Sequence, residues 1–245
     1  MPRYRITLAY DGTDFVGWQR QPSGTSVQGL LEDALRDLDQ RDVTVVGAGR
    51  TDAGVHALEQ VAAFTLGRDI GAAALVRAVN VRLPDAVRVL TAQPASEDFH
   101  PQFDSTGKAY RYRIWNGLVL LPFERRYVWH VPCDLDVDGM QRAAKMVEGK
   151  HDFAAFQATD SDTKTTTREV FTSEVRSQKY EVVYDVSGGG FLRHMVRTIA
   201  GTLVDIGRGR FPAERMEEIL ASRDRTKAGR TAPATGLFLV RVNYR

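Results

Sequence analysis

Two segments in which apolar and polar residues alternate strictly constrain the fold of this 245-residue chain more than any other feature. In Arg3–Tyr10 the side chains of Tyr4, Ile6 and Leu8 would share one face of an extended strand. Residues 108–115 alternate in the same way, with two tyrosines and an isoleucine on one face and two arginines on the other. A period of two residues is typical of strands in a sheet that is covered on one face only. We therefore expect sheets that need helices to cover one of their faces.

A helical pattern follows the first of these strands. Apolar residues from Val27 to Leu38 recur at i, i+3, i+4 and i+7, with charged residues on the opposite side, which predicts an amphipathic helix packed on a sheet. Thr25 and Gln28 match a capping box with Thr25 as the N-cap. Similar patterns predict helices at 72–81, 137–147, 191–206 and 213–221, strands at 43–46, 60–66, 87–92, 171–176, 180–186 and 237–242, and a loop at 161–168.

The best candidate for a domain boundary is the polar, irregular stretch at residues 94–107, which contains two prolines. Each side of this stretch begins with a strand and carries a helix packed behind later strands. The predicted fold class is therefore α+β, with two similar halves that each form a mostly antiparallel sheet with helices on one face. The expected domains are residues 1–105 and residues 106–245.

The composition is that of an ordinary globular protein, with 43% apolar and 26% charged residues. Cys133 is the single cysteine, which excludes an intramolecular disulfide and a zinc site built from several cysteines. The first residues alternate instead of forming the apolar core of a signal peptide, and no apolar run approaches the roughly 18 residues that span a bilayer. We expect a soluble, cytoplasmic protein without a membrane partner.

Positive charge is concentrated near one end of the sequence. The formal charge of the whole chain is +2, but residues 193–245 hold 11 Lys and Arg against 5 Asp and Glu. Such a basic segment fits a nucleic-acid partner, although solvated basic surfaces are common. The candidate phosphate contacts are Arg111, Arg113, Lys164, Arg168, Arg208, Arg210 and the Arg223-Asp224-Arg225-Thr226-Lys227 cluster.

Motifs for metals and dinucleotides fail on inspection. Asp134 to Gly139 matches the first half of an EF-hand loop, but Lys145 stands where the bidentate glutamate is required, so Asp136 or Asp138 is better interpreted as a helix cap. The five histidines show no metal-ligand spacing. Gly47-Ala48-Gly49 begins like a dinucleotide fingerprint but has Asp52 at the sixth position. No metal site is expected.

The most unusual stretch is Gly47-Ala48-Gly49-Arg50-Thr51-Asp52-Ala53-Gly54-Val55-His56-Ala57. Its glycines allow positive φ angles and a close approach of the backbone to a ligand. The aspartate in this loop, Asp52, is compatible with two interpretations. It either closes a structural Asx-turn or serves as a reactive carboxylate, and the residues alone leave both open.

A resemblance gives this loop a function. Residues 49–57 resemble the catalytic loop of the tRNA pseudouridine synthase A (TruA) family, and further blocks resemble the same family in the same order along nearly the whole chain. These blocks are Tyr10-Asp11-Gly12-Thr13 with Gly17-Trp18-Gln19, Phe99-His100-Pro101, Lys108-Ala109-Tyr110-Arg111-Tyr112, Gly149-Lys150-His151-Asp152-Phe153 with Phe156, Gly190-Phe191-Leu192-Arg193-His194-Met195-Val196-Arg197 and Ala232-Pro233-Ala234-Thr235-Gly236-Leu237.

The resemblance implies the pseudouridine synthase fold, with an active-site cleft between the two halves. It also implies isomerisation of uridine to pseudouridine at positions 38, 39 and 40 of the tRNA anticodon stem-loop, without a cofactor or metal. By this resemblance Asp52 is the nucleophile, and Arg197 on the long helix pairs with it. Tyr110 packs on the target base and assists proton transfer, while Leu237 closes the pocket. Arg50 would fill the gap that the flipped base leaves.

Each of these roles has a plainer alternative. Arg197 could be an exposed helix arginine, and Arg193, expected one turn earlier on the same face, is its rival for the pairing with Asp52. Tyr110 could be a half-buried strand aromatic, as Tyr112 is expected to be, and Leu237 could be an ordinary strand leucine. Three histidines of the matching blocks are interpreted as structural: His56, His151 and His194.

One position departs from the family pattern, because Gln102 stands where an arginine is expected. We assign Gln102 no role. The family also implies a homodimer in which one tRNA contacts both subunits. Two other classes of function stay open on the residues alone: an RNA-binding protein without activity, which has no need of the Asp52 carboxylate, and a metal-dependent phosphoesterase.

Overall fold

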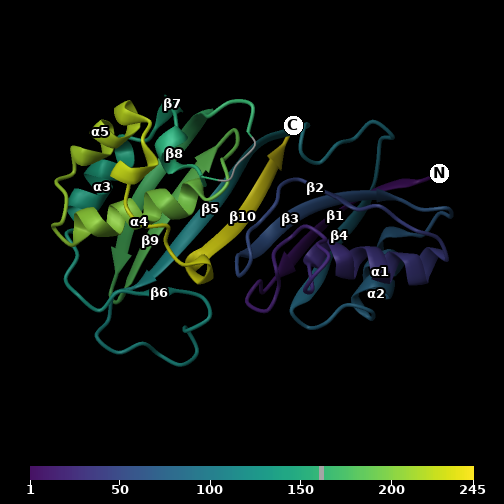
Figure 1. Cartoon of the computed structure of the whole chain (residues 1–245). Coiled ribbons are helices and arrows are strands. Elements are labelled where there is room, and N and C mark those ends of the chain that lie inside the picture. Colours follow the sequence, from purple (N-terminus) through teal and green to yellow (C-terminus); the bar gives the residue numbers. More distant parts are fainter. Residues whose placement is uncertain (160–162) are drawn as a thin grey trace. The chain divides into compact units, whose positions relative to one another are not determined.

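The computed structural model describes residues 1–159 and 163–245 and divides into two compact units (Figure 1). The first unit consists of Met1–Thr106 and Phe238–Arg245, and the second of Gly107–Leu237. The expected domains differ from these units mainly in the last strand, which the sequence assigns to the second half. Residues 238–245 belong to the first unit because this strand runs parallel to a first-unit strand, with Phe238 beside His56.

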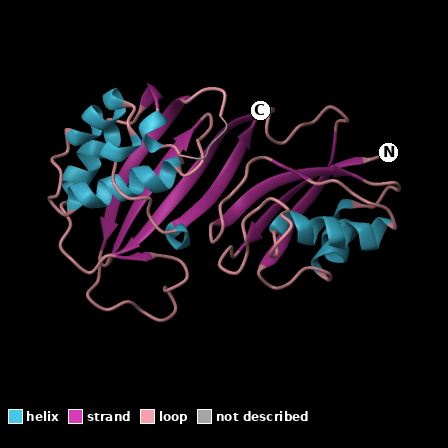
Figure 2. Cartoon of the chain, viewed as in Figure 1, coloured by secondary structure: helices cyan, strands magenta, loops and turns pink. Residues whose placement is uncertain are grey.

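The first unit is a sheet with two helices on one face (Figures 1 and 2). Strands β4, β1 and β3 are antiparallel neighbours, β10 lies parallel to β3, and β2 pairs with β3. The elements are β1 (Arg3–Tyr10), α1 (Val27–Asp39), β2 (Val46–Gly47), β3 (His56–Thr65), α2 (Ala72–Asn80), β4 (Val87–Ala95) and β10 (Leu237–Tyr244).

The alternation in β1 gives this unit its core. Every second residue of the strand is buried, and Tyr4, Ile6 and Leu8 are each at most 1% exposed. Leu31 and Leu35 of α1 are fully buried. Burying one such side chain contributes about 1.5–3 kcal/mol, so the two periodic patterns together account for the pairing of helix and sheet. The strand and helix predictions for these segments are confirmed.

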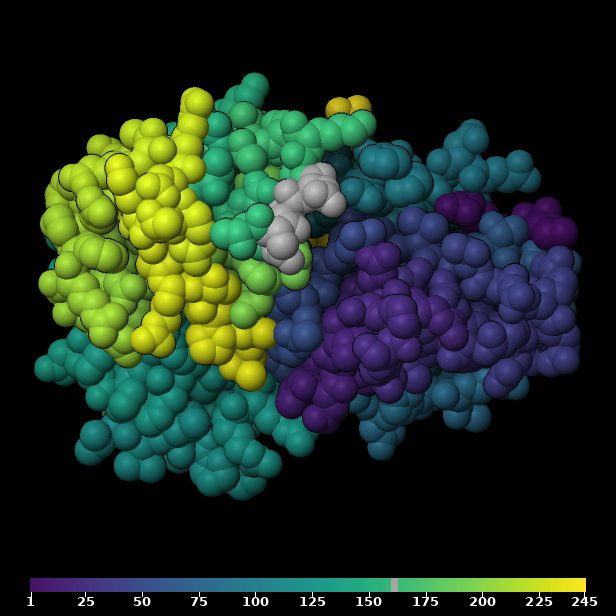
Figure 3. Space-filling model, in the orientation of Figure 1, coloured from purple at the N-terminus to yellow at the C-terminus, as the bar shows by residue number. Residues whose placement is uncertain are grey.

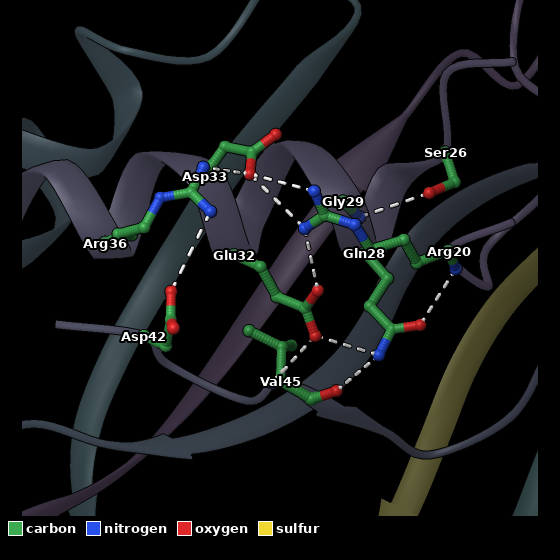
Figure 4. A network of polar contacts seen from close by, with 9 residues as sticks. All are labelled: Arg20, Ser26, Gln28, Gly29, Glu32, Asp33, Arg36, Asp42 and Val45. Atoms are coloured by element: carbon green, nitrogen blue, oxygen red, sulfur yellow. Dashed lines mark hydrogen bonds and ion pairs between the residues drawn. The ribbon is translucent and has the colours of Figure 1, made fainter. Parts of the chain in front are cut away.

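The N-cap of α1 is Ser26 and not Thr25 (Figure 4). The Ser26 hydroxyl accepts a hydrogen bond from the Gly29 amide at 3.2 Å. The side chain of Gln28, expected to complete a capping box, instead donates to Glu32 and to the Val45 carbonyl at 2.9 Å. The helix therefore anchors the stretch that leads into the glycine-rich loop.

The strands before and after the glycine-rich loop differ from the sequence prediction. Residues 43–45 form no strand, although Val43 and Val45 are buried, and only Val46–Gly47 pairs with β3. The β3 strand begins at His56, four residues earlier than expected, so the end of the glycine-rich motif is part of the sheet.

The second unit is likewise a sheet with helices on one face (Figures 1 and 2). The strands run in the order β5, β9, β8 and β7, all antiparallel, and β6 pairs parallel with β5. Its elements are β5 (Ser105–Trp115, whose first two residues belong to the first unit), β6 (Trp129–His130), α3 (Val137–Lys145), β7 (Gly149–Asp152), η1 (Ala154–Phe156), β8 (Thr167–Gln178), β9 (Glu181–Gly188), α4 (Met195–Gly207), α5 (Arg215–Ser222), η2 (Arg225–Lys227) and η3 (Ala234–Gly236).

Both units thus bear out the α+β prediction of two mostly antiparallel sheets, each covered by helices on one face. Asp136 caps α3 by accepting a hydrogen bond from the Gly139 amide at 2.8 Å, as one of the two expected caps. Two of the residues in the loop predicted at 161–168 lie outside the described residues, and Thr167 and Arg168 already belong to β8. Within the described part of the chain, no helix is both long and apolar enough to cross a membrane.

The long helix α4 begins at Met195, four residues later than predicted. His194 has a φ of 64°, which lies in the left-handed region and cannot be part of an α-helix. Arg193 therefore precedes the helix, and the expectation that it lies one turn before Arg197 on the same helical face is wrong.

The cap assignment predicts a difference between two neighbouring hydroxyl residues. Ser26→Ala should lower the free energy of unfolding by about 1 kcal/mol, because the Gly29 amide loses its acceptor. Thr25→Ala, the matched control, should leave the free energy of unfolding within about 0.5 kcal/mol of wild type. Urea unfolding followed by circular dichroism measures both, and a larger loss for Thr25→Ala would contradict the assignment.

Candidate active site

The loop that carries Asp52 is a turn closed by its own main chain. The Asp52 carbonyl accepts a hydrogen bond from the Val55 amide at 3.1 Å, and Gly54 has a φ of 78°. An Asx-turn would use the Gly54 amide as donor to the Asp52 carboxylate. That amide instead donates to the Phe15 carbonyl at 3.3 Å. Main-chain hydrogen bonds therefore close the turn around the half-buried Asp52 side chain.

The turn after β1 clamps this loop through close main-chain contacts. A Cβ atom at Gly12 would lie 1.9 Å from the Val55 carbonyl oxygen, so only glycine fits there. Gly17 has a φ of 105° and would place a Cβ 2.6 Å from the Thr51 carbonyl oxygen. The same oxygen accepts a hydrogen bond from the Trp18 amide at 3.1 Å. Main chain thus touches main chain on both sides of Asp52.

A cluster of buried polar side chains, those of Tyr10, Thr51 and Gln60, supports the Asp52 loop. The Tyr10 and Thr51 hydroxyls are 2.9 Å apart, and the Gln60 amide nitrogen donates to the Gly49 carbonyl at 2.9 Å and lies 3.5 Å from the Tyr10 hydroxyl. Burial raises the pKa of Tyr10 to about 12, so its phenol is protonated at neutral pH. None of these three residues was predicted from the sequence to support the loop. Their signal was a tyrosine at the end of an alternating strand and a glutamine inside an apolar one.

His56 fixes the entry into β3. Its Nδ1 accepts a hydrogen bond from the Gly12 amide at 3.1 Å and lies 3.2 Å from an Asp11 carboxylate oxygen. The ring is 1% exposed and stacks on Phe238 of β10 with 4.6 Å between centroids. These contacts fit the structural interpretation of His56.

In the second unit, Tyr110 lies on β5 opposite Val186 of β9. Its half-buried ring meets the ring of Phe191 edge-on, with centroids 5.1 Å apart and an interplanar angle of 80°. Edge-to-face contact restricts the ring to one orientation. Phe191 was expected to begin the long helix, but it precedes α4 and supports this tyrosine instead.

Arg197 lies in the first turn of α4 and is held by Ala232 at two points. Its Nε donates to the Ala232 carbonyl at 2.8 Å, and its own carbonyl accepts a hydrogen bond from the Ala232 amide at 3.0 Å. The guanidinium is half-buried and does not behave as a solvated surface group.

Leu237 is 6% exposed and follows a short 3-10 turn that packs on Tyr112. Tyr112 is fully buried, so the expectation of a half-buried strand aromatic is wrong for it. Its hydroxyl donates to the Pro233 carbonyl at 2.8 Å. Burial raises the pKa of Tyr112, and the nearby Arg197 guanidinium opposes this shift. Tyr112 therefore supports the segment that leads to Leu237.

The five predicted site residues are thus divided between the units. Asp52 and the exposed Arg50 belong to the first unit, and Tyr110, Arg197 and Leu237 to the second. Within residues 1–159 and 163–245, no three His, Cys, Asp or Glu side chains gather as a metal site would require.

Most of the candidate phosphate contacts are engaged inside the second unit. Four of the arginines form ion pairs with carboxylates and two donate to main-chain carbonyls, while Lys164 and Lys227 are exposed. The ion pairs are Arg111 with Asp185, Arg113 with Glu124 and Glu181, Arg210 with Asp205 and Arg223 with Asp152, and the arginines on main-chain carbonyls are Arg168 and Arg225. The remaining candidate, Arg208, lies over the Trp129 ring, 5.9 Å from its centre. The sequence alone does not separate these groups, because the folded chain decides which partner each side chain meets.

The chain is similar in sequence to known proteins along nearly its whole length. A family model described as tRNA pseudouridine synthase matches residues 6–104 and 143–245. The tRNA pseudouridine synthase A of Pelobacter propionicus is 48% identical over 244 residues, covering all of both chains. That of Myxococcus xanthus is 47% identical over all of this chain and 93% of its own length. That of Solibacter usitatus is 46% identical over the full length of both.

The chain belongs to the tRNA pseudouridine synthase family, and its α+β architecture is the pseudouridine synthase fold. It is accordingly an enzyme, an isomerase that converts uridine in tRNA.

The close contact at Gly12 predicts a large effect of one methyl group. Gly12→Ala should lower the free energy of unfolding by about 1–3 kcal/mol, because the added carbon collides with the Val55 carbonyl and the main chain must move. Gly189→Ala is the matched control, since the nearest atom to the added carbon is an exposed phenylalanine ring carbon at the ordinary distance of 3.7 Å, and it should cost no more than about 0.5 kcal/mol. Urea unfolding measures both variants. Equal costs would show that the clamp on the Asp52 loop is not tight.

Proposed function

We propose that this enzyme isomerises uridines 38, 39 and 40 of the tRNA anticodon stem-loop, with Asp52 as the nucleophile. The observation that carries the proposal is the fixed loop around Asp52. Main-chain hydrogen bonds and two close glycine contacts hold the residues on both sides of this carboxylate. A rigid loop that presents an aspartate fits a covalent catalyst, since a nucleophile must be held in reacting geometry.

The reaction explains why a carboxylate is suited to this task. The N1–C1′ bond of uridine must break, the ring must rotate, and a C5–C1′ bond must form. An ionised carboxylate adds to the nucleotide and leaves again, so the enzyme is regenerated without a cofactor. The C5 proton is lost and N1 gains a proton, which keeps product and substrate isomers. The adduct at uracil C6 and the adduct at C1′ are both compatible with this scheme.

Arg197 is proposed as the partner that keeps Asp52 ionised and oriented. A guanidinium is always charged at neutral pH and offers a rigid set of donors that match a carboxylate. The hydrogen bond from Arg197 Nε to the Ala232 carbonyl at 2.8 Å supports this role, because it fixes the side chain in advance. Arg193 is a weaker candidate since it is exposed and lies outside α4.

Three further residues are proposed to receive the target base. Tyr110 packs on the uracil ring, and its edge-on contact with Phe191 supports this role by holding the phenol ring in place. Leu237 contributes an apolar wall. Arg50, which is exposed beside the Asp52 turn, fills the space in the RNA stem when the nucleotide is flipped out.

Two exposed lysines of the second unit, Lys164 and Lys227, are proposed to contact tRNA phosphates. We also propose that the enzyme works as a homodimer that binds one tRNA across both subunits, in the cytoplasm. Sedimentation equilibrium of the purified protein tests the dimer, and a mass of 27.3 kDa for the species in solution would refute it.

The role of Asp52 predicts a nearly inactive variant with intact binding. Asp52→Asn should lower tritium release from tRNA that carries 5-tritiated uridine by about 1000-fold or more, since the amide is a poor nucleophile. The affinity for tRNA in a filter-binding assay should stay close to that of the wild type. Asp42→Asn is the control, because this carboxylate of the same unit is 95% exposed, and it should retain full activity. Wild-type turnover by Asp52→Asn would refute the proposal that Asp52 is the nucleophile.

The proposed specificity predicts the positions of the product. Unmodified tRNAs incubated with the purified enzyme should contain pseudouridine at positions 38, 39 and 40 and at no other uridine, as mapped by carbodiimide modification and primer extension. The reaction should proceed unchanged in EDTA. Product elsewhere in the tRNA would contradict the specificity and leave the isomerase activity in place, whereas loss of activity in EDTA would contradict the metal-free mechanism.

A further inference from the structure

Arg225 makes contacts that do not suit a phosphate-binding residue. Its two terminal nitrogens donate to the Gly229 carbonyl and to the Thr231 hydroxyl, each at 3.0 Å. The side chain is half-buried, unlike that of Lys227 two residues later. The Asp224 carboxylate accepts hydrogen bonds from the amide and hydroxyl of Thr226, which fixes the short turn that carries Arg225. The planar guanidinium is therefore used to hold two points of a nearby stretch of chain.

That stretch, Gly229–Ala232, is called the strap here. It belongs to the chain segment drawn in yellow at the surface of the second unit in Figure 3. The Gly229 amide donates to the Thr202 hydroxyl of α4 at 3.0 Å, and the Thr231 hydroxyl lies 3.5 Å from that of Thr198. The strap thus lies along α4 and bonds to its side chains.

The contact between the strap and α4 is as close as two main chains can be. A Cβ atom at Gly201 would lie 1.8 Å from the Arg230 carbonyl oxygen, and one at Gly229 would lie 2.7 Å from the Thr202 Cα. Real Cβ contacts do not occur at such distances, so the two glycines are required for this seating of the strap.

The end of the strap is the group that holds Arg197. Ala232 accepts a hydrogen bond from Arg197 Nε at 2.8 Å and donates its amide to the Arg197 carbonyl at 3.0 Å. Because Nε is part of the rigid guanidinium plane, a shift of the Ala232 carbonyl turns the whole group. The position of the strap therefore sets the direction in which Arg197 points.

We infer that Arg225 is a positioning residue, which holds the strap so that Arg197 is oriented for its partner. The inference rests on the proposed role of Arg197. It removes Arg225 from the phosphate contacts that the charge pattern suggests and gives it a task inside the second unit. A displacement of about 1 Å at a catalytic group can lower the rate about 100-fold, so a residue of this kind acts on turnover and not on tRNA affinity.

Kinetics and salt dependence separate the two roles. Arg225→Ala should lower kcat for tritium release by about 10- to 100-fold, while KM and the slope of log K for tRNA against log salt stay at wild-type values. A phosphate contact would show the opposite: kcat retained, KM raised and the slope reduced by about 0.7–0.9. That result overturns the inference, and so does an Arg225→Ala enzyme with wild-type kinetics.

Arg230→Ala is the matched control, because it removes an exposed arginine of the strap that grips neither Arg197 nor Gly229. It should retain wild-type kcat. A loss of kcat equal to that of Arg225→Ala would overturn the inference, because the loss of one positive charge would then explain both variants. Thr231→Val removes one of the two acceptors and should lower kcat less than Arg225→Ala does. If Arg225→Ala does not fold, this variant carries the test, and an unchanged kcat for it then overturns the inference.

A double-mutant cycle asks whether Arg225 acts through Arg197. In single-turnover assays, Arg225→Ala should lower the rate in the wild-type enzyme and have no further effect in Arg197→Ala, since coupled residues are not additive. Additive losses overturn the inference and leave the proposed role of Arg197 intact. Wild-type rates in Arg197→Ala would instead refute the proposed role of Arg197 itself, so the two failures are distinguishable.

Discussion

The shape of the Asp52 loop depends on a main-chain contact between the turn after β1 and the end of the loop. The contact is so close that no side chain fits between the two stretches. Gly12 lies against the Val55 carbonyl so closely that a single methyl group would not fit. This approach lets the turn after β1 donate and accept hydrogen bonds on both sides of Asp52. The buried Tyr10–Thr51 pair then fills the space beneath, where an unsatisfied hydroxyl would cost about 1–3 kcal/mol. The neighbouring main chain and this buried pair therefore hold the loop in its shape.

The second unit uses the same physical device for a different group. Gly201 of α4 permits the strap to lie directly on the helix, and Ala232 at the end of the strap fixes Arg197. In both units a glycine that would suggest a flexible backbone in the sequence instead permits a close, fixed contact between two stretches of main chain. The candidate site residue of each unit, Asp52 or Arg197, lies beside that contact and is positioned by it.

Hydrophobic periodicity was enough to predict the strands of the two mostly antiparallel sheets and most of their helices. Buried residues recur every two residues in a strand and about every 3.6 in a helix, whichever element packs against them. It failed where single residues decide. His194 adopts a left-handed conformation and delays the start of α4, and Ser26 caps α1 in place of its neighbour. The candidate site residues came from a motif, whereas their supports, Tyr112 and Arg225, were not predictable. Arg225 contacts Gly229, four residues away, and Tyr112 contacts Pro233, 121 residues away. Only the folded chain brings these groups together.

The membership of β10 in the first unit has a consequence for biosynthesis. Residues 238–245 complete the sheet beside β3, and Phe238 covers the ring of His56 at the end of the Asp52 loop. Domains generally fold as units, and the amino-terminal part of a chain emerges from the ribosome first. Here that part emerges without one of its strands. The unit that carries Asp52 can reach its final structure only after residues 238–245 have left the ribosome. The Asp52 loop of the nascent enzyme therefore lacks the cover of Phe238 until translation has passed the second unit.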